Sequence, residues 1–159
     1  MASSLTELLF LIDTGYDRAS WHGPNLRGSL RGLTPRRAAW RPGKQRHSIW
    51  ELVVHAAYWK YVAWRRLTGA TPGSFPLKGS NWFARRRDLS AGLWRDDLAL
   101  LDEMHRSLRA AVADLHPGDL DRTGGRKSKV TTRALVAGIA AHDVYHAGQI
   151  QLLKKLAPR

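Results

Sequence analysis

Cysteine is absent from this chain of 159 residues. Without thiols there is no disulfide framework, no thiolate-ligated metal and no cysteine nucleophile. A chain that needs no disulfides suits the reducing cytosol, so we expect a cytoplasmic protein. The first ten residues, MASSLTELLF, also lack the basic segment and the long apolar stretch of a secretion signal.

Long apolar runs and acidic residues are both scarce. No apolar run approaches the roughly 20 residues that a helix needs to cross a bilayer, so we expect no membrane partner. The 13 acidic residues face 26 Lys and Arg, which gives a formal net charge of +13 at pH 7. A basic protein can bind nucleic acid, but here the basic residues lie in short groups dispersed along the chain. We interpret them as a basic surface and expect no specific nucleic-acid binding.

Strict alternation of polar and apolar residues, the mark of a strand, does not occur. Hydrophobic residues make up 43% of the chain, which suits one globular domain over residues 1–159. Helical spacing of apolar residues predicts four helical regions, 3–32, 47–68, 90–115 and 131–156. The first should break near Trp21 to Gly23 and resume from Pro24 to about Arg31, because proline fits the first turn of a new helix.

The connections between these regions are long. Residues 33–46, with two prolines and a glycine, are expected to form a connection, and so is the non-periodic segment Thr71–Leu89. Ser48 with Glu51 predicts a capping box at the start of the second region, and Gly69 predicts its end. The fold class predicted is therefore all-α, a four-helix bundle with long connecting loops.

His142 and His146 stand four residues apart in the apolar segment VAGIAAHDVYHAGQIQLLKK. Residues at this spacing lie on one face of a helix, so both imidazoles can reach one metal ion. They can also be core histidines with hydrogen-bond partners. His55, in the apolar stretch ELVVHAAYW, supplies a third imidazole. Three neutral nitrogen ligands leave a fourth position open, which is the pattern of catalytic sites.

The segments HSIWELVVHAAYW and AAHDVYHAGQIQLLKK resemble the DinB-like family, and the resemblance covers nearly the whole chain. It implies that His55, His142 and His146 bind a divalent metal. It also implies a four-helix bundle in up-down-down-up order and a homodimer. Family members include thiol-dependent S-transferases, which use bacillithiol or mycothiol, and a mycothiol-dependent maleylpyruvate isomerase.

Two chemistries suit such a centre. The metal can lower the pKa of bound water to about 7, or it can bind a low-molecular-weight thiol as its thiolate. Histidine ligands suit Zn, Ni or Fe, so the sequence does not name the metal. We therefore expect a metal-dependent transferase or hydrolase that acts on a small-molecule substrate. The alternative is a metal-bound, non-catalytic protein with a structural or sensory role in stress.

Candidates for the substrate pocket come from two loops. WHGPNL interrupts the first helical region where a bundle needs no break, so Trp21 and His22 are candidates. GSNWF, in the long loop, offers Asn81 and Trp82 as a lid or wall. An ordinary helix break and an ordinary loop explain the same residues without a pocket.

Overall fold

The computed structural model describes residues 4–85, 89–123 and 129–158. Over these residues the protein is helical and has no strand, which confirms the all-α class. None of these helices has an apolar stretch long enough to span a lipid bilayer. The helices are α1 (Ser4–Tyr16), α2 (Leu26–Ser29), α3 (Pro35–Ala39), α4 (Ile49–Thr68), α5 (Ala91–Ala113) and α6 (Thr132–Leu156), and a 3₁₀ turn, Pro117–Asp119, follows α5.

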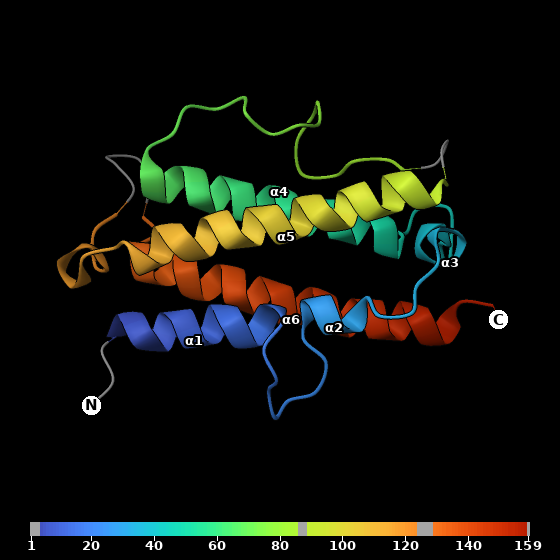
Figure 1. Ribbon diagram of the computed structural model, residues 1–159, viewed down its shortest axis with the longest axis horizontal. Helices are drawn as coiled ribbons and strands as arrows, with labels where there is room; N and C mark the ends of the chain where they lie inside the picture. Colours follow the sequence, from blue (N-terminus) through green and yellow to red (C-terminus); the bar gives the residue numbers. More distant parts are fainter. Residues whose placement is uncertain (1–3, 86–88, 124–128, 159) are drawn as a thin grey trace.

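The helices α1, α4, α5 and α6 lie lengthwise beside one another (Figure 1). α4 packs against both α5 and α6, and α1 also packs against α5 and α6. In Figure 1, α1 and α6 run from left to right, whereas α4 and α5 run from right to left. Because α4 and α5 point the same way, the chain between them has to return along the length of the molecule. Part of that return, Arg86–Asp88, lies outside the described residues.

The ends of α4 form as the sequence predicts. The Ser48 hydroxyl accepts a hydrogen bond from the Glu51 backbone, and the Glu51 carboxylate accepts one from the Ser48 backbone. This reciprocal pair satisfies backbone donors that the first turn leaves free. Gly69 ends the helix with φ of 72°, a left-handed conformation that costs little without a β-carbon. The two caps fix the ends of α4, and they therefore fix the position of His55 along the bundle.

Two local predictions were wrong. The helix expected from Pro24 to about Arg31 is only α2, because the Asn25 side chain accepts from the backbone of Gly28 and so starts the helix after Pro24. The connection expected over residues 33–46 contains α3. Its start combines Thr34 as N-cap with Pro35 in the first turn, a signal that the sequence carried in TPRRAA.

A layer of buried polar residues separates two apolar clusters. One cluster includes Trp50, Leu101 and Ile150, and the other includes Leu108, Val136 and Ile12. Between the clusters, α4 places Lys60, α5 places His105, and α6 places Asp143 and His146, all of them buried. Buried polar groups are costly unless they are paired, so the members of this layer need partners inside the protein.

Candidate metal centre

Three histidines from two helices meet between α4 and α6. The Nε2 atom of His142 lies 3.2 Å from Nε2 of His55 and 3.0 Å from Nε2 of His146. One ligand atom from each residue can be chosen so that all three lie within 4.8 Å of one another. His142 and His146 share a face of α6 because they are four residues apart, and α4 packs against that face. The structure thus brings together the three histidines that the sequence singled out.

The hydrogen bonds of two rings set their tautomers. Nδ1 of His55 donates to the backbone carbonyl of Asn81 over 2.8 Å. Nδ1 of His146 donates to the side-chain carbonyl of Gln149 over 2.7 Å. A neutral imidazole has one N–H, so Nε2 of both rings carries a lone pair that points at the third histidine. Partners of this kind orient metal-binding histidines and raise their basicity.

The third ring, that of His142, cannot donate a hydrogen bond to both of the other rings. His142 Nε2 can donate one proton at most, yet it faces two lone pairs. One of the two N···N contacts would therefore lack a proton between its atoms. A cation that accepts all three lone pairs removes this conflict. The residues present consequently fit a divalent metal ion with three neutral nitrogen ligands.

Burial keeps the imidazoles uncharged near neutral pH. Loss of solvation lowers the pKa of His55 to about 4 and that of His142 to about 3. It also lowers the pKa of His146, although the hydrogen bond that this ring donates to Gln149 acts in the opposite direction. Neutral imidazole is the form that binds metals, so the ligands need no deprotonation at pH 7.

The long loop before α5 contributes directly to the centre. Besides its carbonyl on His55, Asn81 accepts a hydrogen bond at its side-chain oxygen from the Trp59 indole, over 2.9 Å. Its φ is 64°, a conformation that asparagine tolerates better than most residues. The Trp82 ring stacks between two imidazoles, with centroids 3.9 Å from His55 and 3.5 Å from His47. Asn81 and Trp82 thus hold the His55 ring in place, and their contact with a substrate stays a prediction.

The other two pocket candidates lie elsewhere. Trp21 is 99% exposed, and His22 beside it is also exposed. Both stand in the loop between α1 and α2, which projects from the lower edge of the molecule in Figure 1. Among the interactions of the described residues, none joins Trp21 or His22 to the three histidines. Their part in a substrate pocket therefore remains an expectation from the sequence.

Sequence reasoning missed Gln149 and Lys60. Gln149 follows His146 by three residues, a helical spacing that places both on one face and could have been noticed. Lys60 is a single charge in the apolar run AAYWKYVAW, and it is fully buried. Its ammonium binds the buried carboxylate of Asp143, which is the neighbour of His142 in sequence. Because Lys60 binds this carboxylate, Asp143 does not join the cluster of three histidines.

Comparison with known proteins agrees with the geometry. A family model described as the DinB superfamily matches residues 18–150, which include all three histidines. No curated protein and no solved structure shows a significant match to the sequence. The family match spans most of the chain. The protein therefore belongs to the DinB superfamily.

Proposed function

We propose that this protein binds one divalent metal ion through His55, His142 and His146, and that the site catalyses a transferase or hydrolase reaction on a small molecule. The observation that carries the proposal is the convergence of three Nε2 atoms, two of them held as lone-pair donors. The helix directions of Figure 1 support an up-down-down-up four-helix bundle as its framework. Zn, Ni and Fe all suit imidazole ligands.

A metal held by three neutral ligands supplies Lewis-acid chemistry at its remaining position, where it can lower the pKa of a bound water or thiol. The chain's own residues prepare that position. Asn81 and Gln149 orient two ligands, and Trp82 covers one face of His55. No protein carboxylate belongs to the described ligand cluster, so the positive charge of the metal is not neutralised by the protein. This charge favours an anionic partner from the substrate or cofactor. Because the chain has no cysteine, any thiol must come from a low-molecular-weight cofactor.

A non-catalytic role, structural or sensory, is the alternative. A cavity of about 240 Å³ next to His142 favours the reaction, because a structural site needs no space for a substrate. The wall of this cavity includes Trp59, whose indole is tied to Asn81, and so the cavity and the metal centre share residues that fix their relative position.

The first test counts metal. After chelation and reloading with Zn, Ni or Fe, the protein should hold about one ion per chain by elemental analysis. His146→Ala should remove this binding, because two imidazoles hold a divalent ion far less tightly than three. His116→Ala is the control, since His116 is exposed and only caps a 3₁₀ turn. One-to-one binding by a variant with all three ligands changed to Ala would show that the assignment is wrong.

The second test measures turnover by the metal-loaded protein. Thiol conjugation to electrophiles, with bacillithiol or mycothiol as donor, and ester hydrolysis cover the two proposed reaction types. Turnover that needs metal and disappears in His146→Ala supports catalysis. Full metal occupancy without turnover in either assay supports the non-catalytic alternative.

A further inference from the structure

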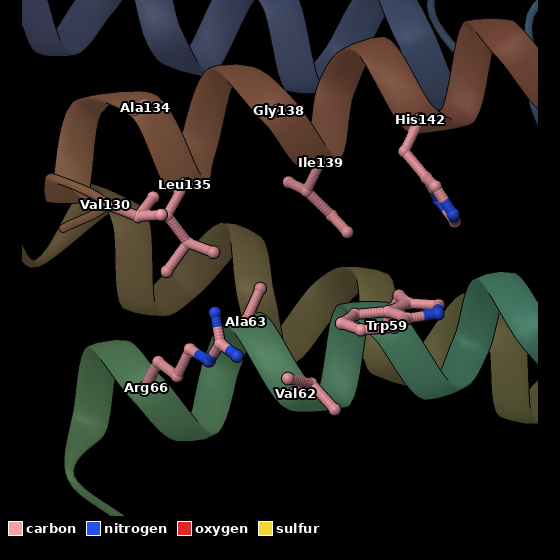
Figure 2. A pocket seen from close by; sticks show the side chains of 10 residues that line it. All are labelled: Trp59, Val62, Ala63, Arg66, Val130, Ala134, Leu135, Gly138, Ile139 and His142. Atoms are coloured by element: carbon pink, nitrogen blue, oxygen red, sulfur yellow. The ribbon is translucent and has the colours of Figure 1, made fainter. Parts of the chain in front are cut away.

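A groove between α4 and α6 begins at the metal centre and leads away from it. Figure 2 shows its two walls, with Trp59 and Ala63 on α4 opposite Leu135 and Ile139 on α6. The groove starts at His142 and reaches Arg66. Its volume, about 240 Å³, is below the usual range for drug-sized ligands, so its occupant is a single ring or a short chain.

The walls of the groove are apolar and its two ends are not. Trp59 and Arg66 are seven residues apart on α4, so about 10 Å of helix separates the end near the histidines from the end near the guanidinium. Figure 2 shows the Arg66 side chain turned from α4 toward α6, into the space between the helices. Among the described residues, no carboxylate forms an ion pair with Arg66, although eight other Lys or Arg side chains pair with carboxylates.

The geometry points to the substrate class: an amphiphilic small molecule with an apolar body and a terminal anionic group. The body lies between Trp59 and Ile139, where it loses contact with water. The anion, a carboxylate or a phosphate-type group, pairs with the guanidinium of Arg66, which matches either geometry. The other end of the molecule then reaches the open side of His142. This inference rests on the proposed function for its reactive end, but the groove and Arg66 can be tested separately.

Binding of an unreactive probe tests the anionic end. Calorimetry with metal-loaded protein compares 4-phenylbutyrate, 3-phenylpropylphosphonate and the neutral 4-phenylbutanamide. The two anions should bind more tightly than the amide, and the better anion identifies the group that the site prefers. Arg66→Gln should weaken the anions about tenfold, as the loss of one charged hydrogen-bonding partner predicts, and should leave the amide unchanged. Arg95→Gln, an exposed arginine on α5, is the control for the change in net charge.

A second pair of variants tests the groove itself. A β-carbon added at Gly138, which lines the groove, meets no atom within 4 Å, and the same is true at Gly148 on the same helix. Both positions have room for a β-carbon, and leucine forms helix better than glycine. Gly138→Leu should fill part of the groove and abolish probe binding, whereas Gly148→Leu should preserve it. Thermal unfolding checks that both variants stay folded.

The outcomes separate this inference from the proposed function. If the amide binds as tightly as the anions, or if Arg66→Gln and Arg95→Gln weaken the anions equally, the substrate class is wrong even when metal binding is intact. The same conclusion follows if Gly138→Leu binds the probes normally. If metal does not bind but the anions still depend on Arg66, the groove assignment stands and the metal-dependent function fails.

Discussion

Lys60 occupies a position where a charge is expensive. It is fully buried, its ammonium binds Asp143, and it lies 3.5 Å from Nδ1 of His105 and 4.7 Å from the centre of the Tyr16 ring. Burial raises the pKa of Asp143, while the ammonium of Lys60 acts in the opposite direction. Removing one member of such a pair leaves an uncompensated buried charge. His105 also stacks on Tyr16, with centroids 3.7 Å apart, so the residues form one connected group.

His105 should make the protein less stable in acid. Burial, followed by the positive charges of Lys60, Arg109 and Arg106, lowers its pKa from 6.5 to about 3. Between those values the unfolded chain binds a proton that the folded chain does not. The stability that His105 contributes is therefore full above pH 6.5 and is lost as the pH falls toward about 3. One such group changes the free energy of unfolding by up to about 1.4 kcal/mol per pH unit.

Urea unfolding of the wild type and of His105→Gln at pH 7.5 and 5 checks this prediction. The wild type should lose about 2 kcal/mol more than the variant between the two pH values. The wild type and the variant share His55, His142 and His146, so the difference in stability between the two proteins at each pH does not contain the titration of these histidines. His105→Phe, which keeps a ring on Tyr16, should match His105→Gln in its pH response. Parallel pH profiles for the wild type and both variants would contradict the assignment.

Residue patterns predicted the cluster of three histidines better than they predicted its surroundings. His142 and His146 could be paired because helical spacing is a property of one segment. His55 was predicted as the third member of the site because it lies in an apolar segment and because the family resemblance implies it. The partner of Lys60 could not be predicted, because the pair joins positions 83 residues apart and depends on how α4 packs on α6. The stacking of Trp82 likewise depends on the path of a loop that has no periodic pattern.

At the scale of the helices, the sequence predicted caps and breaks but did not predict which helices contact one another. The ends of α4 were predicted because each depends on a few neighbouring residues. The close approach of α1 to α6 was not. A β-carbon at Gly15 would lie 3.0 Å from the carbonyl oxygen of Ala140 and 3.6 Å from Cγ2 of Val144. Gly15 therefore sets how near α1 lies to α6. The contact is with Ala140, which lies two residues before His142 on α6.

Replacing Gly15 should separate these helices. Gly15→Ala should lower the free energy of unfolding by about 1–3 kcal/mol, because the backbone oxygen it meets cannot move independently of α6. Gly148→Ala is the matched control, since that glycine is helical with open space around it. The control should gain up to about 1 kcal/mol from helix propensity. Chemical denaturation measures both, and equal stabilisation of the two variants would mean that the contact is not tight.

At the scale of the whole molecule, α6 exposes an apolar stripe. Tyr145, Leu152 and Leu156 are 64%, 58% and 55% exposed, and their spacing places them on one side of the helix. On α1, which packs against α6, Phe10 and Leu11 are also exposed. An exposed apolar surface of this kind is typical of a protein–protein contact. It supports the proposal of a homodimer, which the sequence suggested through the family resemblance.

Light scattering across micromolar concentrations should give the mass of a dimer. Leu152→Glu should shift the protein toward monomer, because a charge buried at the contact has no partner. Leu89→Glu is the control: Leu89 is 44% exposed and lies outside the helices. A monomeric wild type at every concentration would contradict the dimer. Because the basic residues lie in short groups dispersed along the chain, we still expect no specific nucleic-acid partner.

The three proposed ligands would also determine when, during synthesis, the site can exist. His55 and His142 are 87 residues apart, and His146 lies 13 residues before the end of the chain printed here. A nascent chain that has exposed only α4 and α5 would hold one of these histidines and could not retain the proposed ion. The proposed metal would therefore stabilise the finished arrangement of helices and none of the earlier partial ones. Retained metal would then mark the molecules in which the last helix has docked.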